Sequence, residues 1–399
     1  MTNASVMIKS VSEEKIIFSL QGRVDSSNSA QLEKELFDLR ANNPGGTVII
    51  DAEDLEYISS AGLRILLRMR KQEGELEMIN VSRDVYDIFE LTGFTDILTV
   101  TRALRTIDVE GCEIIGTGCS GTVYRLDKDT IVKLYRPWIS LEEIQKEREY
   151  AKIAFLNGIP TAISYDVVRS GESYGLVFEM LRSDTLGQAY KKYPEQYDEL
   201  TRKYVAFVKD FHQQKMPEDT FYSIQSLLHS RADGLNEWCT QEEIDLLHSL
   251  IDCMPESVSP IHGDLHPGNI MMQDGELMII DMTEMTTGPA IYDIINVYRD
   301  IVAAPRLSPK SIEASMGLPA EIIKKIGDDF FALYTGLDDR ALLDEYYAKQ
   351  ELLYAFNVCL TVGIGPEKIR NNASKILDRQ LRKTVIPNEA TLRELLQNL

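Results

Sequence analysis

The stretch Ile261-His262-Gly263-Asp264-Leu265-His266-Pro267-Gly268-Asn269-Ile270 decides the fold expected for most of this 399-residue chain. It places one carboxylate, Asp264, five residues before Asn269 in a segment punctuated by glycine and proline. Twelve residues after Asn269, the apolar run 277–280 ends at a second carboxylate, Asp281. Loops and strand ends are positions from which polar side chains converge without distorting a helix.

This pattern is typical of phosphoryl transfer. In such sites one Asp orients and deprotonates the attacking hydroxyl, while an Asn and a second Asp hold the magnesium ions that neutralise the phosphates. The alternative is an ordinary surface turn with acidic neighbours, so the rest of the chain has to decide between them.

The composition is that of a soluble globular protein, with 44% hydrophobic and 26% charged residues. The net charge of -21 argues against nucleic acid or an anionic membrane as a general partner. A cationic small substrate would be attracted, although an acidic surface also serves solubility. The five cysteines form no C-x-x-C pair, and no apolar run approaches the about 18 residues of a membrane-spanning helix. These features predict a cytoplasmic protein with reduced thiols.

The first hundred residues predict a small α/β unit. Strands are expected at 5–10, 15–20, 47–51 and 76–81, and helices after Ser26 or Asn28, after Ser60 and over 85–91. The β-branched run 47–51 favours a parallel sheet.

This segment resembles the anti-sigma-factor antagonist (STAS) domain, most specifically in Tyr57-Ile58-Ser59-Ser60-Ala61-Gly62-Leu63. The resemblance implies that Ser60, at a helix start, is phosphorylated by a partner kinase. An exposed hydroxyl there gains a phosphate where backbone N–H groups favour anions. The family usually has Asp where this chain has Ser59, and Ser or Thr where it has Ala61. The alternative is that Ser59 and Ser60 only cap the helix.

From residue 113 onward the pattern changes to short strands around a glycine-rich loop containing Gly116, Gly118 and Gly121. A dinucleotide fingerprint of this kind must open a helix, whereas the β-type run 122–126 follows here. The next strand, 131–135, carries Lys133 at its centre. A glycine-rich hairpin followed by a strand lysine is the arrangement of kinases.

The expected partner of Lys133 is a glutamate of the helix 141–157. Glu147 and Glu149 are both candidates, but they point about 200° apart on a helix. Glu149 has Ile153 and Leu156 at i+4 and i+7, which predicts an inward stripe, so Glu149 is preferred. Two more strands, 163–169 and 174–179, complete a five-stranded lobe. The connector 178–181 follows, and its backbone is placed to meet an adenine edge.

Residues 113 to about 300 resemble the aminoglycoside phosphotransferase and choline kinase superfamily, which is related to protein kinases. The resemblance implies an ATP- and Mg²⁺-dependent enzyme. In it Lys133 meets the nucleotide phosphates, braced by Glu149, and Asp264 is the catalytic base. Asn269 and Asp281 are the implied metal ligands, whereas His262 and His266 look structural. The nucleotide would contact Gly116, Gly118, Gly121, Val123, Lys133, Glu179 and Leu181.

Two departures bear on the substrate. Asp281-Met282-Thr283 stands where relatives often have Asp-Phe-Gly, so the loop loses the flexibility of a glycine. Only eleven residues separate Asp281 from Asp293, too few for the usual peptide-docking segment of a protein kinase. This favours a small-molecule hydroxyl acceptor.

The sequence therefore predicts an α/β STAS domain with a mixed sheet over residues 1–106. An α+β bilobal protein-kinase-like fold follows over 107–399, with an N-lobe at 107–181 and a C-lobe at 182–399 that contains a helical insertion, 185–254. The predicted function is phosphotransfer to a small molecule, with the first domain regulating the enzyme or binding an anti-sigma-like protein. The alternatives are a protein serine kinase acting on Ser60 and a signalling scaffold that binds nucleotide without turnover.

Overall fold

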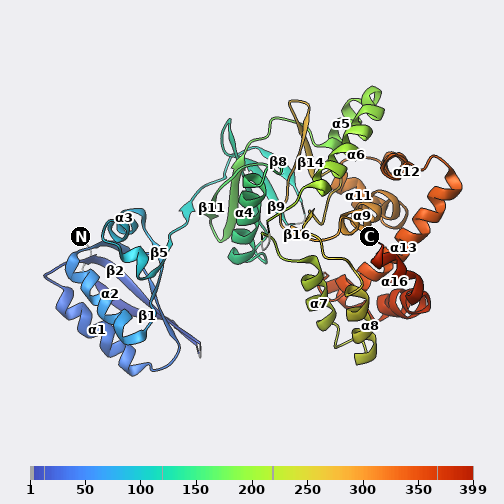
Figure 1. The fold of residues 1–399 in the computed structure, drawn as a ribbon. Helices are drawn as coiled ribbons and strands as arrows, with labels where there is room; N and C mark the ends of the chain where they lie inside the picture. The colour runs from blue at the N-terminus through green and yellow to red at the C-terminus, as the bar shows by residue number, and fades with distance from the viewer. Residues whose placement is uncertain (1–3, 13, 119, 218–219, 366, 399) are drawn as a thin grey trace. The chain divides into compact units, whose positions relative to one another are not determined.

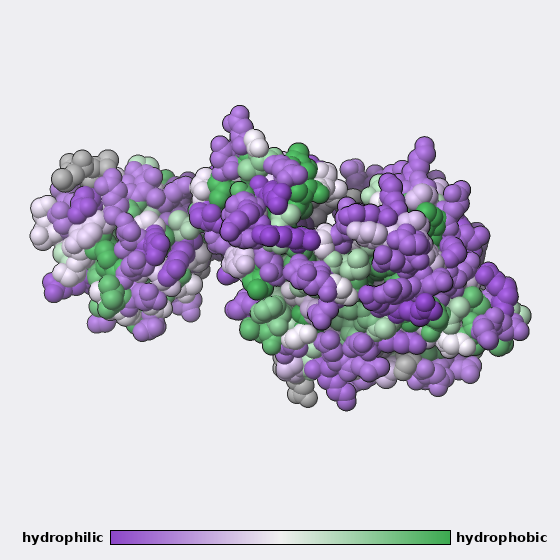
Figure 2. All heavy atoms as spheres, turned by 90° about the horizontal axis from the view of Figure 1, so that it is seen from above, coloured by the Kyte–Doolittle hydropathy of each residue, from purple (hydrophilic) through white to green (hydrophobic). Residues whose placement is uncertain are grey.

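A computed structural model describes residues 4–12, 14–118, 120–217, 220–365 and 367–398. The chain divides into two compact units, Met1–Ile107 and Asp108–Leu399 (Figure 1). Cys119, in the predicted glycine-rich loop, lies outside the described residues. Hydrophilic residues dominate the displayed surface of each unit, and hydrophobic residues form separate small patches among the hydrophilic ones (Figure 2).

The first unit is built on a mixed sheet of order β1-β2-β3-β5-β6, with β4 paired to the end of β2. The strand β1 runs antiparallel to β2, whereas β3, β4, β5 and β6 pair in parallel. The strands span Ser5–Val11, Lys15–Val24, Thr47–Asp51, Leu55–Ile58, Glu77–Val81 and Thr99–Arg102. A two-residue strand, β7 (Arg105–Thr106), ends the unit.

Helices α1 (Ser29–Asn42) and α2 (Ser60–Glu73) lie side by side, and α3 (Arg83–Leu91) and a short 3₁₀ turn (Phe94–Asp96) follow. Sheet residues such as Phe18, Ile50 and Met78 are almost fully buried under these helices. The alternating burial along β2 and the continuous burial of β3 are what a sheet covered by helices requires. The predicted mixed α/β fold is confirmed.

The second unit begins with an antiparallel sheet in which β11, β12, β10, β9 and β8 lie in that order. These strands cover Ser164–Ser170, Ser173–Glu179, Thr130–Tyr135, Gly121–Arg125 and Ile114–Thr117. Helix α4 (Leu141–Leu156) packs against β11 and β12 and starts with a capping box formed by Ser140 and Glu143. This is the predicted lobe of five strands and one helix.

The remainder is mainly helical. It contains α5 (Leu186–Lys192), α6 (Tyr197–Gln213), α7 (Ile224–Asp233) and α8 (Gln241–Ile251). Two small antiparallel sheets of two strands follow, β13 (Pro260–Ile261) with β16 (Thr286–Thr287) and β14 (Ile270–Gln273) with β15 (Glu276–Ile279). The later helices are α9 (Ile291–Tyr298), α10 (Ala304–Leu307), α11 (Pro309–Met316), α12 (Ala320–Thr335), α13 (Arg340–Thr361), α14 (Glu367–Arg370), α15 (Ala373–Leu377) and α16 (Glu389–Gln397). Two π-helical segments, Arg299–Ala303 and Asp378–Val385, interrupt this series.

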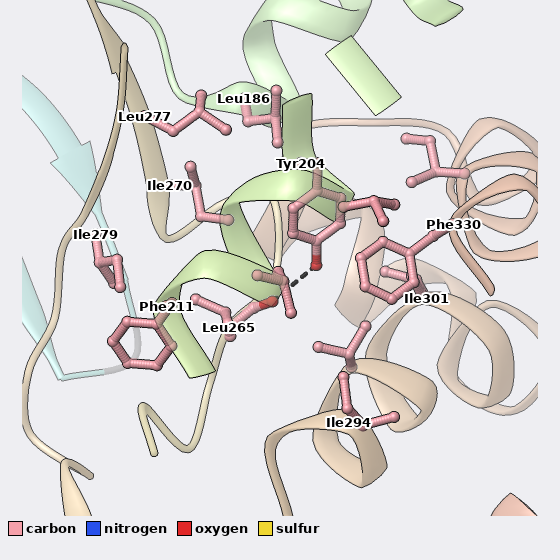
Figure 3. Packing of buried hydrophobic residues seen from close by; sticks show 14 of the residues in the cluster. Leu186, Tyr204, Phe211, Leu265, Ile270, Leu277, Ile279, Ile294, Ile301 and Phe330 are labelled. Carbon is pink, nitrogen blue, oxygen red and sulfur yellow. Dashed lines mark hydrogen bonds between the residues drawn. The ribbon is translucent and has the colours of Figure 1, made fainter. Parts of the chain in front are cut away.

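The core of the helical part reaches directly to the segment quoted above. Leu265 is fully buried among α6, α9 and α12, and the Tyr204 hydroxyl donates a hydrogen bond of 2.8 Å to its carbonyl oxygen (Figure 3). Ile270 and Ile279 bury the flanking strands in the same cluster. The loop 262–269 is thus anchored by packing on both sides. No helix within the described ranges is both long and apolar enough to cross a membrane.

Candidate active site

A single buried carboxylate fixes the start of the loop 262–269. Asp293, at the start of α9, accepts hydrogen bonds from the backbone N–H groups of His262 and Gly263 at 2.8 and 2.6 Å. The Nε2 atom of His212 lies 3.0 Å from the same carboxylate. Asp293 is fully buried, so its charge requires these donors. The three contacts hold the backbone just before Asp264 in one position.

The ring of His262 connects this loop to the strand that leads to Asp281. Its Nδ1 atom accepts the Asp264 N–H at 3.3 Å, and its Nε2 atom lies 3.1 Å from the Ile280 carbonyl oxygen. Both ring nitrogens are used and the side chain is buried. The geometry agrees with a structural role for His262, and it joins the neighbourhoods of the two carboxylates.

The Asp264 carboxylate is held on both oxygens. Asn269 donates to Oδ2 at 2.9 Å, and Arg299 donates to Oδ1 at 2.9 Å. His266 Nε2 lies 3.5 Å from Oδ2. Because the Gly268 N–H donates to Nδ1 of His266, the ring carries its proton on Nε2, on the side of Asp264. His266 therefore does more than was expected, since it contacts the predicted base.

These contacts keep Asp264 ionised. Desolvation in the site raises the pKa of this carboxyl, but the hydrogen bond from His266 and the charge of Arg299 outweigh it and hold the pKa well below its usual range. The side chain is nevertheless 42% exposed, so its oxygens remain accessible to a ligand.

Lys133, on β10, forms an ion pair with Glu147 of α4. The distance from Lys133 Nζ to Glu147 Oε1 is 3.0 Å, and the distance to Asp281 Oδ2 is 3.3 Å. Burial lowers the pKa of Lys133, but Asp281 and Glu147 outweigh it and raise the pKa above its ordinary value. The lysine is thus a buried cation between two carboxylates.

The preference for Glu149 as the partner of Lys133 is wrong. The inward face of α4 consists of Ile144, Glu147, Ala151 and Ala154, whereas Leu156 is 70% exposed. Glu149 lies on the outer face and pairs with Lys152 at 3.5 Å. The expected stripe relied on large apolar residues, but small alanines mark the face that packs against the sheet.

Asp281 has a left-handed backbone with φ of 67°, a conformation that is costly for a residue other than glycine and is common at functional sites. The next polar side chain, Thr283, lies 2.7 Å from Asp281 Oδ1 and 2.9 Å from Glu147 Oε2 through its hydroxyl. Thr283 therefore bridges the acidic residues on either side of Lys133.

One residue of the glycine-rich hairpin, Val123, shares a face of the sheet with Lys133. Val123 and Lys133 are directly opposite each other on β9 and β10, so their side chains project from one face. Gly121 is required by strand packing, because a Cβ atom there would lie 2.2 Å from the Leu134 carbonyl oxygen. A Cβ atom at Gly118 would meet nothing within 4 Å, and one at Gly116 would make only ordinary contacts with Val123.

Some of the polar groups in the connector after β12 already form hydrogen bonds within the protein. The Glu179 carboxylate accepts the Ile163 N–H at 2.7 Å, and the Met180 N–H donates to the Asp129 carbonyl oxygen at 2.7 Å. Leu181 is buried, and within the described ranges its N–H makes no backbone hydrogen bond. A ligand at this connector would therefore meet backbone groups, not the Glu179 side chain.

A cleft of about 340 Å³ opens beside Asp264. Its polar lining comes from α7, α9, the π-helical segment after α9, α13 and the segment after Asp281. It includes Arg231, Glu284, Tyr292, Asn296, Arg299 and Asn357. Sequence reasoning missed Arg299 and Arg231. Arg299 lies 35 residues beyond Asp264 in an apolar helix, and no local pattern marks it.

In the first unit, Ser60 is exposed at the first position of α2. The preceding residue, Ser59, is the N-cap, yet its side chain makes no capping hydrogen bond and its hydroxyl is buried without a partner among the described residues. The Ser59 side chain therefore does not cap the helix by a hydrogen bond, and phosphorylation of Ser60 stays a prediction. The Ser60 hydroxyl is accessible at a helix N-terminus, where a phosphate would be favoured.

Comparison with known proteins assigns both units. Residues 111–350 match the model of the phosphotransferase enzyme family. The chain belongs to the phosphotransferase enzyme family. Residues 7–107 match the STAS domain model. The fold and both resemblances inferred from the sequence are confirmed, and with them the prediction of a phosphotransferase acting on an alcohol group.

Several curated relatives match the STAS domain of this phosphotransferase. BtrV of Bordetella bronchiseptica, whose name describes an anti-sigma factor antagonist, is 39% identical over 92 residues, which are 22% of this chain and 78% of BtrV. The anti-sigma-B factor antagonist of Bacillus subtilis is 27% identical over 103 residues, which are 25% of this chain and 92% of that protein.

Solved structures match the larger part of this phosphotransferase. The streptomycin-ATP complex of APH(2")-IIa has a TM-score of 0.42 and 14% identity, covering 67% of this chain and 90% of that chain. A choline/ethanolamine kinase family protein from Mesorhizobium loti has a TM-score of 0.42 and 12% identity, covering 72% of this chain and 92% of that chain. The family model, not these structures, carries the assignment.

Proposed function

We propose that residues 107–399 transfer a phosphoryl group from ATP, with Mg²⁺, to the hydroxyl of a small molecule, and that residues 1–106 regulate this activity or bind a protein partner. The observation that carries the proposal is the setting of Asp264. It is ionised, hydrogen-bonded by Asn269 and Arg299, and lies on the wall of a cleft large enough for a small acceptor.

Asp264 supplies the proton acceptor. A hydroxyl that donates a hydrogen bond to this carboxylate is oriented for attack, and its proton passes to Asp264 as the new bond forms. Because the pKa of Asp264 is low, the carboxylate is a weak base in the resting site. Its main contribution is then orientation of the hydroxyl, with proton transfer late in the reaction.

The residues present fit a nucleotide with magnesium. Asn269 directs its Nδ2 atom to Asp264, which leaves its Oδ1 atom as an oxygen ligand. Asp281 supplies carboxylate oxygens, and the residue before it, Ile280, donates its N–H to the Asn269 carbonyl oxygen at 2.9 Å. Mg²⁺ prefers oxygen ligands and is usually held by one or two carboxylates together with substrate phosphates. No cluster of three His, Cys, Asp or Glu side chains suited to a metal occurs in the described ranges, which fits a metal that arrives with nucleotide. Bound magnesium would neutralise phosphate charge, and Lys133 would bind phosphate oxygens.

The segment after Asp281 supports a small acceptor. The strand β16 (Thr286–Thr287) pairs with β13 (Pro260–Ile261), which immediately precedes the loop 262–269. The segment is therefore tied back to the site within a few residues. It leaves no long strand or loop of its own on which a peptide could dock.

A second candidate is a serine kinase that phosphorylates Ser60 of this or another chain. It is favoured by the exposure of Ser60 at the start of α2. The names of the curated relatives describe anti-sigma factor antagonists, which supports an anti-sigma-like protein as the partner of the first unit. A nucleotide-binding scaffold without turnover is disfavoured, because Lys133, Asp264, Asn269 and Asp281 are all present.

The variant Asp264→Asn tests the proposal. ADP release with acceptor should fall by about 10²–10⁴-fold, the usual contribution of a general base, while ATP binding measured by calorimetry is retained. Asp274→Asn is the matched control, because Asp274 is exposed in the turn between β14 and β15. Near-normal turnover in Asp264→Asn would remove the proposal.

A further inference from the structure

The cleft beside Asp264 has an unexpected charge balance. The whole chain carries a net charge of -21, yet two arginines, Arg231 and Arg299, and two carboxylates, Asp264 and Glu284, line this cleft. A site built for a polycationic acceptor would present an excess of carboxylates. The charges that line the cleft therefore balance, whereas the protein as a whole is strongly acidic.

Of the two arginines, Arg299 is already satisfied. Its guanidinium binds both oxygens of Asp300 at 2.7 and 2.8 Å as well as Asp264 at 2.9 Å. These two carboxylates neutralise the guanidinium charge and hold Arg299 next to Asp264, the proposed base. Arg299 is therefore not available to a ligand.

Arg231, on α7, is in a different state. Its side chain is only 11% exposed, yet its contacts are long, 3.4 Å to the Tyr292 hydroxyl and 3.5 Å to Glu284 Oε2. Its Nε–H is buried and has no partner among the described residues. A buried guanidinium without good acceptors is costly, and an oxyanion that takes two of its N–H groups removes that cost.

Glu284 is a replaceable partner. Its side chain is 57% exposed, so it can turn into solvent when another anion approaches Arg231. A Cβ atom at Gly263 would lie 2.7 Å from the Cβ atom of Glu284, which places the pair next to the loop that carries Asp264. The two charges therefore lie at the side of the cleft on which the reaction is proposed.

A continuous polar wall leads from Arg231 to the base. The Tyr292 hydroxyl, contacted by Arg231, donates to Asn357 Oδ1 at 2.8 Å. Asn357 donates to Asn296 Oδ1 at 3.3 Å, and this oxygen also accepts from Arg299 at 3.2 Å. All of these side chains line the same cleft. A ligand bound to Arg231 can therefore form hydrogen bonds along this wall and reach Asp264 with its other end.

We propose that the acceptor bears an oxyanion, a carboxylate or a phosphate, that Arg231 binds while its hydroxyl faces Asp264. This rests on the proposed function and names its substrate class. A polycationic aminoglycoside is excluded as the preferred acceptor, because it would place positive charge against Arg231.

The test uses four compounds that differ in one substituent: glycerate, glycerol 3-phosphate, glycerol and 3-amino-1,2-propanediol. Their binding to the full chain is measured by calorimetry with a non-hydrolysable ATP analogue and Mg²⁺. One or both anions should bind about 10–100-fold more tightly than glycerol, the range expected for hydrogen bonds to a charged group, and the amine should bind no better than glycerol. The two anions distinguish a carboxylate from a phosphate.

Four variants separate an effect on binding from an effect on folding. Arg231→Gln should abolish the preference for anions, and Arg231→Lys should restore part of it. Glu284→Gln should strengthen anion binding, a gain that loss of structure cannot produce. Arg340→Gln, at an exposed site on α13, is the matched loss of an arginine and should change nothing.

The inference is overturned if the amine binds best, if no anion binds better than glycerol, or if Arg231→Gln leaves the preference unchanged. Failure of the proposed function has a different signature. In that case wild-type protein given a small-molecule cell extract releases no ADP, whatever the charge of the acceptors.

Discussion

The Arg299 guanidinium donates a hydrogen bond of 2.9 Å to Asp264 Oδ1 and also holds both oxygens of Asp300, the next residue in the chain. Arg299 begins a π-helical segment, which changes the direction of the side chains that follow α9. Such segments are often found at functional sites. The contact makes Arg299 a positioning residue for the proposed base.

We predict that Arg299→Gln lowers kcat/KM by about 10–100-fold, because one charge-assisted hydrogen bond to Asp264 is lost. The acid limb of the pH–rate profile should also move to higher pH, since removal of the nearby cation raises the pKa of Asp264. Steady-state ADP release measured across pH checks both effects. An acid limb at the wild-type position would exclude electrostatic control of Asp264 by Arg299.

The same shift bears on stability. A carboxyl whose pKa in the folded protein lies below its unfolded value contributes stability above the unfolded pKa, and this contribution is lost as the pH falls through the folded pKa. Asp264 in the wild-type protein should therefore stabilise the fold at neutral pH. Arg299→Gln should narrow the pH range in which that contribution persists.

The pairing of Lys133 gives a second prediction with a built-in control. Glu147→Gln should lower kcat/KM by about tenfold or more, because the buried Lys133 loses one charged partner. Glu149→Gln, two residues away on the exposed face of α4, should remain close to wild type. Equal losses in the two variants, measured by ADP release, would contradict the observed orientation of α4.

Magnesium gives the third prediction. Asn269 and Asp281 should bind Mg²⁺ only when nucleotide supplies phosphate oxygens, since Mg²⁺ rarely occupies an all-protein cage. Calorimetric titration of Mg²⁺ should show weak binding to the protein alone and tighter binding with an ATP analogue. Asp281→Asn should remove the second effect. Tight binding of Mg²⁺ without nucleotide would contradict the assignment.

The fourth prediction concerns Ser60. Ser60→Asp should change association with an anti-sigma-like partner, or kinase activity, because it adds negative charge to an exposed face. The fold should be kept, since an acidic residue is favourable in the first turn of α2. Ser60→Ala should behave as the unphosphorylated protein. Identical partner binding and activity in all three proteins would remove Ser60 from the account.

Local sequence patterns were sufficient for much of the fold. The run 47–51 coincides with β3, and the helix expected over 141–157 coincides with α4 to within one residue, because hydrophobic periodicity and the Ser140 cap both act locally. The Lys133 position also follows from its strand. The buried face of α4 could not be predicted in this way, because Ala151 and Ala154 are only weakly hydrophobic although they are fully buried.

Residues that reach the site through tertiary packing were not predictable. Arg299 and Arg231 lie on different helical segments, 35 residues after and 33 residues before Asp264, and only the tertiary fold brings them to one cleft. Thr283 is a similar case, since its contribution to the site depends on a contact with Glu147 of α4, which is 136 residues earlier in the chain. The pattern of charged residues along one sequence does not show which of them lie close together in the folded protein.

The most direct measurement is a label-transfer assay. Full-length protein and Asp264→Asn are incubated with γ-labelled ATP, Mg²⁺ and a small-molecule cell extract, and low-mass products are then separated from protein. We expect label in a low-mass product formed by the wild-type protein, and no such label with Asp264→Asn. Label on Ser60 with none in the low-mass fraction would contradict it and establish the serine kinase in its place.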